Sequence, residues 1–175
     1  MTDPTPAPTE PAQPDAMAAT AIHALIGLAA TVAVAESLTG GLVCAALTSV
    51  PGASAVMRGG VIAYATDLKA ALLGVDSELL AREGAVHPDV AVAMARGVAT
   101  RLDAEYGVAT TGVAGPEPQD GHPVGQVYIA VAVGDEVVVR ALSLDPVLGR
   151  SGIQAATVVA ALQLLNDMLA QVEGP

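Results

Sequence analysis

The 175-residue sequence contains no phenylalanine or tryptophan and only three tyrosines, although 53 % of its residues are hydrophobic. Most of those residues are alanine and valine, so large aromatic side chains cannot anchor the core. A chain of this length can nevertheless bury a sizeable core as one compact domain. We therefore expect helices and strands that approach one another closely through small side chains.

Cysteine and histidine are also scarce. The single cysteine, Cys44, excludes a disulfide framework, and the three histidines at positions 23, 87 and 122 lack the spacing of a zinc site. Cys44 lies in an apolar stretch, where burial raises the thiol pKa and disfavours a role as nucleophile. The sequence therefore predicts neither a metal site nor another cofactor.

Basic residues number seven against 18 acidic residues, which gives a formal net charge of −11. A surface this acidic repels phosphate backbones and anionic lipid headgroups. Residues 16–35 are uncharged and long enough to span a bilayer, but they are rich in alanine, include polar residues and have no basic flank. We predict a soluble, cytoplasmic protein without a nucleic-acid or membrane partner.

Proline is concentrated at the N-terminus, at positions 4, 6, 8, 11 and 14. The segment 1–16 is rich in proline, alanine and threonine and cannot bury enough apolar surface to offset the entropy of ordering. It is predicted to be a disordered tail, and residues 17–172 to form a single domain.

Hydrophobic periodicity within that domain predicts helices that alternate with strands. The last two predicted strands are joined by Gly134-Asp135, a hairpin signal. This order predicts an α/β three-layer sandwich with a mixed, mostly parallel sheet flanked by helices. The expected helices cover 18–28, 41–47, 67–73, 88–104 and 151–170, and the expected strands cover 31–35, 60–65, 106–111, 126–133 and 137–144.

Two glycine-containing segments follow predicted strands, VAVAESLTGG at 32–41 and TTGVAGP at 110–116. Ligands of α/β folds bind at the carboxyl ends of strands. A helix start rich in serine, threonine and glycine offers unpaired N–H groups and a positive dipole end to an oxyanion. Simple capping by Ser37 or Thr39 is the alternative. The first segment matches neither a P-loop nor a hydrolase nucleophile elbow.

Lys69 is the only lysine, and the other six basic residues are arginines. Arginine does not release its proton in a protein, whereas a desolvated lysine can. Lys69 is therefore either a base or a solvated residue of a short helix. Tyr64 precedes it at the end of a predicted strand, where its hydroxyl either bonds the backbone or relays a proton.

Six motifs follow one another between about residues 18 and 170: AESLTGG, VPGAS, GGVIAYATDLK, GAVHPDVAVAMA, TTGVAGP and PVGQVYIAV. In this order they resemble the CinA C-terminal domain family, whose characterised members are nicotinamide-nucleotide amidohydrolases. The resemblance implies hydrolysis of the carboxamide of nicotinamide mononucleotide to nicotinic acid mononucleotide and ammonia, without a metal. Such an enzyme recycles pyridine nucleotides.

The resemblance also implies which residues form the site. The family's nucleophile falls on Ser37, and its lysine and tyrosine fall on Lys69 and Tyr64. Neutral Lys69 would accept the Ser37 proton directly or through Tyr64. We expect the oxyanion at the N–H groups that begin the Thr39–Gly41 helix. The expected substrate-binding residues are Thr39, Gly40, Gly41, Ser54, Thr111, Gly112 and Arg150.

Two segments depart from the family's pattern. Its late GDR motif reads LGR at 148–150, with Gln154 in place of the second basic residue that follows, and its Gly-rich loop reads EPQDGH at 117–122. A non-catalytic nucleotide-binding or regulatory domain, or a Ser/Lys amidase for another amide, therefore stays open. The expected partners are a small-molecule nucleotide substrate and further copies of the chain, because apolar, Ala-rich helices suit a homodimer or higher homo-oligomer.

Overall fold

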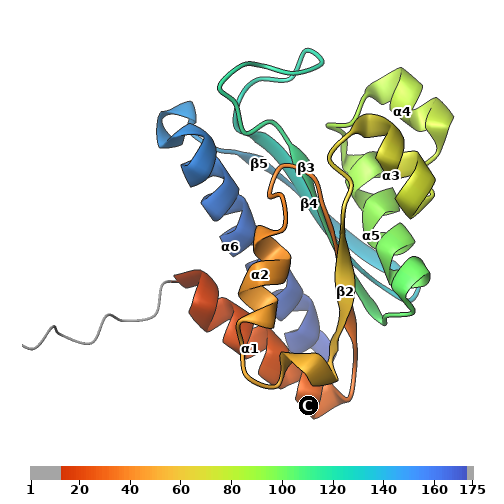
Figure 1. Ribbon diagram of the computed structural model, residues 1–175, viewed down its shortest axis with the longest axis vertical. Helices are drawn as coiled ribbons and strands as arrows, with labels where there is room; N and C mark the ends of the chain where they lie inside the picture. Colours follow the sequence, from red (N-terminus) through yellow and green to blue (C-terminus); the bar gives the residue numbers. More distant parts are fainter. Residues whose placement is uncertain (1–12, 173–175) are drawn as a thin grey trace, which may run out of the picture.

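A computed structural model describes residues 13–172, which form an open sheet with helices on both faces (Figure 1). The strands are β1 (Val32–Glu36), β2 (Met57–Ile62), β3 (Tyr106–Gly112), β4 (Gln126–Val133) and β5 (Glu136–Ser143). The helices are α1 (Gln13–Leu28), α2 (Leu42–Thr48), α3 (Thr66–Leu73), α4 (Ser77–Glu83), α5 (Pro88–Leu102) and α6 (Gly149–Val172). Short 3-10 turns, η1 (Ala53–Ala55) and η2 (Pro146–Leu148), precede β2 and α6.

Across these described residues the sheet has the strand order β2-β1-β3-β4-β5. β1 pairs in parallel with β2 and β3, whereas β4 runs antiparallel to β3 and β5. Four of the five strands therefore run in one direction, and the predicted three-layer sandwich with a mixed, mostly parallel sheet is confirmed. Glu36 lies opposite Thr110, so β1 and β3 end together at one edge of the sheet.

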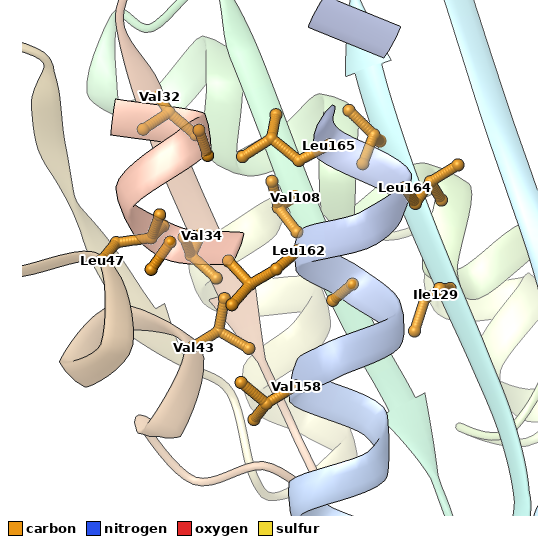
Figure 2. Close-up of a cluster of buried hydrophobic side chains, with 14 of the residues drawn as sticks. Val32, Val34, Val43, Leu47, Val108, Ile129, Val158, Leu162, Leu164 and Leu165 are labelled. Carbon is orange, nitrogen blue, oxygen red and sulfur yellow. The ribbon is translucent and has the colours of Figure 1, made fainter. Parts of the chain in front are cut away.

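The two faces of the sheet carry side chains of different size. Toward α1, α2 and α6, β1 presents Val32 and Val34, which pack with α6 leucines such as Leu162 (Figure 2). Toward α5, the same strand presents Ala33 and Ala35. Alternation of side chains along a strand produces this division. The alanine face lets α5 lie close to the sheet, as the composition predicts.

Helix α6 is apolar because it is a core helix of the domain. Together with η2 it spans Pro146–Val172 and is long and apolar enough, by length and composition, to cross a membrane. Half of its most apolar window is nevertheless buried inside the domain. Its buried side chains, among them Ile153 and Leu165, belong to the cluster formed with the sheet and α1. Burial against the protein therefore accounts for its composition.

Helix α1 begins at Gln13, before the expected domain start at residue 17. Residues 13–16 are thus helical. The proline at position 14 is compatible with this, since proline is tolerated in the first turn of a helix. Four side chains of α1 are completely buried, which anchors the helix: Ala18, Ala21, Ile22 and Leu25. The rest of the expected disordered tail, residues 1–12, lies outside the described residues.

Two further elements differ from the expectation. The strand expected at 60–65 is β2, which pairs with β1 only as far as Ile62. The residues that follow, Ala63 and Tyr64, leave the sheet and contribute to the candidate site described below. Helix α4 was not predicted, although Asp76 marks its start as an N-cap that accepts a hydrogen bond from Glu78 N at 2.9 Å.

Candidate active site

The end of β1 places Ser37 at the carboxyl edge of the sheet. Its N–H donates to the carbonyl of Thr110 at 3.0 Å, so the residue stays registered against β3. The chain then turns through Gly40 and Gly41, whose φ angles of +60° and +107° are readily adopted by glycine. Ser37 is buried and lines a pocket. A short strand and a tight glycine turn therefore fix this hydroxyl.

Lys69 reaches Ser37 from α3. Its Nζ lies 3.1 Å from Ser37 Oγ, 2.8 Å from the Ala63 carbonyl and 3.4 Å from the Tyr64 carbonyl. The side chain is only 1 % exposed, which is rare for lysine. This burial lowers the pKa of Lys69 from 10.5 to about 8, because it disfavours the charged form. A neutral amine at this place can accept the proton of the Ser37 hydroxyl.

The side chain of Glu36 occupies the N-terminus of α2. Its Oε2 accepts from the N–H groups of Gly41 and Val43 at 2.9 and 3.1 Å, and its Oε1 accepts from Cys44 N at 2.8 Å. The sequence pattern predicted no role for this carboxylate. The sequence feature that could have indicated such a role is a lone acidic residue between an apolar strand and a pair of glycines.

The expected oxyanion donors must be corrected accordingly. The N–H of Gly40 donates to the Ser37 carbonyl at 3.1 Å, and that of Gly41 is bound to Glu36. Neither glycine can donate to a ligand without breaking a bond. Within residues 13–172, the N–H groups of Leu38 and Thr39 have no acceptor, and Leu38 lines the pocket. These two groups, next to Ser37, are the donors that the turn leaves available.

The pocket brings together six of the ten predicted residues: Ser37, Tyr64, Lys69, Thr111, Gly112 and Arg150. The Thr111 hydroxyl donates to the Ala85 carbonyl at 2.7 Å, so this hydrogen bond links β3 to a second segment that lines the pocket. Thr39 is not a lining residue, because its hydroxyl is buried against that of Thr110 at 2.8 Å. Part of the altered loop borders the pocket through Glu117 and Gln119.

Ser54 lies away from this pocket. It is exposed in η1, immediately before β2. Because β2 runs parallel to β1, η1, which precedes β2, lies at the amino edge of the sheet (Figure 1). Ser37 follows the carboxyl end of β1, at the opposite edge. The serine taken over from the family's motif therefore does not join the other site residues in this chain.

Arg150 and Tyr64 form a second pair at the pocket. Arg150, in the first turn of α6, donates to the Gly115 carbonyl at 2.7 Å and to the Tyr64 hydroxyl at 2.6 Å. The Tyr64 side chain is 57 % exposed, and only its backbone carbonyl contacts Lys69. The structure therefore does not bring the phenol to Ser37 or Lys69; it brings it to the arginine.

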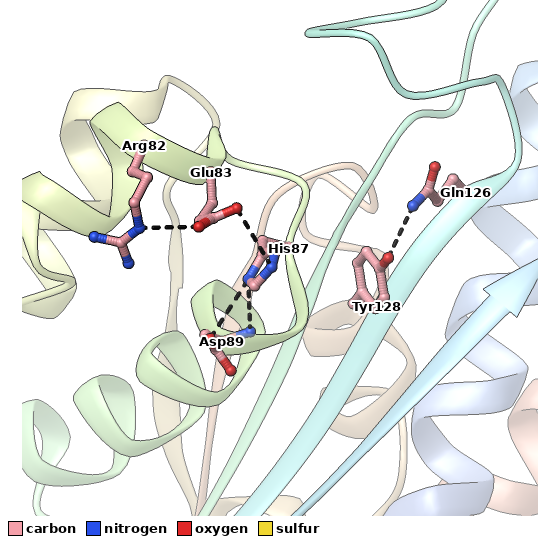
Figure 3. Close-up of polar contacts among 6 residues, drawn as sticks. All are labelled: Arg82, Glu83, His87, Asp89, Gln126 and Tyr128. Carbon is pink, nitrogen blue, oxygen red and sulfur yellow. Dashed lines mark hydrogen bonds and ion pairs between the residues drawn. The ribbon is translucent and has the colours of Figure 1, made fainter.

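Figure 3 shows polar contacts among Arg82, Glu83, His87 and Asp89, around the start of α5, and between Gln126 and Tyr128 on β4. His87 caps α5 by accepting from Asp89 N at 3.3 Å, directly after the lining residue Val86. Gln154 Nε2 donates to the Leu38 carbonyl at 2.7 Å and so supports the turn that carries Ser37. Among the described residues, no three His, Cys, Asp or Glu side chains gather in a way that could hold a metal ion.

Residues 14–169 match the protein family described as the CinA C-terminal domain. A CinA-like protein of Frankia casuarinae is 51 % identical over 156 residues, which are 89 % of this chain and 36 % of that protein. A putative competence-damage inducible protein of Geobacillus kaustophilus is 45 % identical over 141 residues, 80 % of this chain and 34 % of that protein. The chain thus spans about a third of the length of these curated relatives.

Solved structures agree with this match. The crystal structure of the competence/damage inducible protein CihA from Agrobacterium tumefaciens has a TM-score of 0.86 and 36 % identity, covering 94 % of this chain and 99 % of that one. A CinA superfamily protein from Klebsiella pneumoniae has the same TM-score, 0.86, at 28 % identity and covers 90 % of this chain and 98 % of that one.

Proposed function

The chain belongs to the CinA C-terminal domain family, and from this premise we propose that it hydrolyses the carboxamide of nicotinamide mononucleotide to nicotinic acid mononucleotide and ammonia. The observation that carries the proposal is the 3.1 Å contact between the buried Lys69 Nζ and Ser37 Oγ. A serine activated by a neutral lysine is a nucleophile suited to amide carbons.

Acylation begins when neutral Lys69 removes the proton of Ser37 and Oγ forms a bond to the carboxamide carbon. The oxyanion of the tetrahedral intermediate can be met by the N–H group of Leu38, which lines the pocket, and such a donor is worth about 3 kcal/mol. The carbon–nitrogen bond then breaks, Lys69 returns the proton to the leaving nitrogen, and ammonia departs. An ester to Ser37 remains.

Deacylation repeats these steps with water. Lys69 takes a proton from the water molecule, whose oxygen forms a bond to the ester carbon. The bond between that carbon and Ser37 Oγ breaks, and the proton on Lys69 returns to Oγ. The product is the nicotinic acid form of the nucleotide, and the protein recovers its starting state. This proposed mechanism requires no cofactor.

The proposed setting of the enzyme is the cytoplasm, with a small-molecule nucleotide as substrate and no nucleic-acid or membrane partner. The net charge of −11 supports this choice, because it opposes binding to polyanionic surfaces. A homodimer or higher homo-oligomer is also proposed. It is supported by the open edge of the sheet at β2, where Ile62 is exposed.

The test of the proposed function is ammonia release from nicotinamide mononucleotide by the purified protein in the presence of a chelator. We expect stoichiometric ammonia and nicotinic acid mononucleotide from the wild type and neither product from Ser37→Ala. A panel of other amides identifies a different substrate if one is preferred. Equal release by the wild type and Ser37→Ala would contradict the mechanism, and binding of the nucleotide without any turnover would favour a regulatory domain.

Arg150→Ala should raise KM for nicotinamide mononucleotide about 10- to 100-fold and leave kcat nearly unchanged, because a hydrogen bond to a charged group contributes about 1.5–3 kcal/mol. The expectation is that Arg150, which lines the pocket that contains Ser37, binds the phosphate of the substrate. Nicotinamide riboside, which lacks the phosphate, should show a smaller effect. Arg140→Ala is the matched control, because Arg140 pairs with Asp167 at 2.8 Å and does not line the pocket. Equal losses on both substrates would exclude the phosphate contact.

A further inference from the structure

Glu36 is a buried carboxylate that the proposed mechanism does not use. Its side chain is 0 % exposed, and no cation of the described residues pairs with it. A buried charge is costly unless hydrogen bonds or an opposite charge compensate it. The three N–H groups at the start of α2 provide this compensation.

The position of Glu36 connects the two halves of the catalytic pair. Its side chain binds α2, so the turn that carries Ser37 is held at both of its ends. Its backbone carbonyl accepts from Ala63 N at 2.9 Å, and the carbonyl of Ala63 in turn accepts from Lys69 Nζ at 2.8 Å. One residue therefore contacts the element that follows the nucleophile and the segment that holds the base.

We propose that Glu36 is a positioning residue, whose carboxylate fixes the turn from Ser37 to Gly41 so that Ser37 Oγ faces Lys69. The inference rests on the proposed function and extends it to a residue that does not line the pocket. In the turn, the N–H of Leu38 stays free of an acceptor at the pocket and is available to the oxyanion.

The carboxylate cannot be replaced by an amide of the same shape. Both oxygens of Glu36 accept hydrogen bonds from backbone N–H groups. In Glu36→Gln, one oxygen becomes an NH₂ group, which would face an N–H donor of α2 instead of accepting from it. The turn must then shift to relieve the opposed donors. Misplacement by about 1 Å can cost a reaction about 100-fold in rate.

The test compares Glu36→Gln with Asp76→Asn. Asp76 is the matched control, because its carboxylate also accepts from a helix N–H, that of Glu78 at 2.9 Å, but it caps α4 and does not line the pocket. We expect Glu36→Gln to lower kcat for nicotinamide mononucleotide about 10- to 100-fold with little change in KM. Asp76→Asn should change only the melting temperature.

A second measurement separates this proposal from the proposed function. A fluorophosphonate probe phosphonylates an activated serine: the Ser37 Oγ–P bond forms as fluoride leaves, and the hydroxyl proton passes to Lys69. Intact-protein mass spectrometry measures the rate. We expect labelling about 10-fold slower or more in Glu36→Gln, unchanged in Asp76→Asn and absent in Ser37→Ala. This result would support the role of Glu36 even if nicotinamide mononucleotide proved to be the wrong substrate.

Two outcomes would overturn the proposal. One is labelling and turnover of folded Glu36→Gln at wild-type rates with only a lower melting temperature, which would make Glu36 purely structural. If Glu36→Gln does not fold, Glu36→Asp replaces it, since it keeps the charge and withdraws the carboxylate by one methylene. Failure of both variants to fold is the other contrary outcome, because it would assign Glu36 to stability alone.

Discussion

Turnover should fall by about 10²- to 10⁴-fold or more when Lys69 is replaced by methionine, which is the range for loss of a general base. Methionine fills a similar volume but cannot accept the Ser37 proton. Arginine in the same place would retain a donor for the carbonyls of Ala63 and Tyr64 but would stay charged, so Lys69→Arg should also be inactive. Steady-state ammonia release measures both. Activity within tenfold of the wild type in either variant would remove Lys69 from the mechanism.

The same substitution should change how stability depends on pH. The Lys69 pKa is about 8 in the folded protein, against 10.5 ordinarily, so the unfolded chain binds more protons between these values. The free energy of unfolding therefore gains a contribution that rises with pH in this window, by at most about 3 kcal/mol. The thiol of Cys44, whose pKa is raised by burial and by Glu36, contributes the opposite slope in wild type and variant alike.

Denaturant unfolding of wild type and Lys69→Met between pH 7 and pH 10 therefore isolates the lysine, because other groups cancel in the difference. Over the same range, kcat/KM of the wild type should rise to a plateau with an apparent pKa near 8, as the base becomes neutral. Parallel stability curves for the two proteins would show that Lys69 is not desolvated.

Gly97→Ala, which adds a single methyl group, should be strongly destabilising, with an expected loss of about 3 kcal/mol in the free energy of unfolding. Gly97 lies on α5, and a Cβ there would stand 1.9 Å from the carbonyl oxygen of Leu73, at the end of α3. A backbone oxygen cannot rotate away as a side chain can. Helix α3 must therefore move, and it carries Lys69 with it, so turnover should fall as well.

The control is Gly27→Ala, the same change in helix α1. A Cβ at Gly27 meets no atom within 4 Å, so the substitution should stabilise the protein by about 0.5–1 kcal/mol through helix propensity. Chemical denaturation of both variants and their kcat values supply the measurement. Equal stability of the two would mean that α3 and α5 are not in such close contact.

The fold was predictable where periodicity alone decides it. The buried strands and the hairpin through Gly134 follow from patterns that hold over many residues, and the structure confirms the sandwich. The strand at 57–62 was misplaced because its glycine-rich sequence has little periodicity, and its ends are set by pairing with β1. Helix α4 was missed because Leu80 is its only buried residue, so its apolar periodicity is weak and its Asp76 cap was the main signal.

Site chemistry was predictable in part. Lys69 stands out as the only lysine, whereas Ser37 was assigned through the family resemblance of its motif. The structure brings the two side chains together at 3.1 Å. The Tyr64 hydroxyl binds Arg150, so its direction depends on where α6 places that arginine. No local sequence pattern encodes this placement. The function of Glu36 depends on a side chain folding over the next turn onto α2. Such contacts arise from tertiary geometry and not from spacing.

The contrast between the two faces of the sheet has a consequence for sequence drift and for engineering. On the α6 face, valines and leucines can exchange volume with one another, since cores tolerate such swaps at small cost. On the α5 face, the side chains of Ala33, Ala35 and Ala109 are already single methyl groups, so nearly every substitution there enlarges a side chain. Enlargement pushes α5 outward, and α3 with Lys69 packs on α5. Substitutions on the α6 face can thus change stability with little effect on the position of Lys69, whereas substitutions on the α5 face move it.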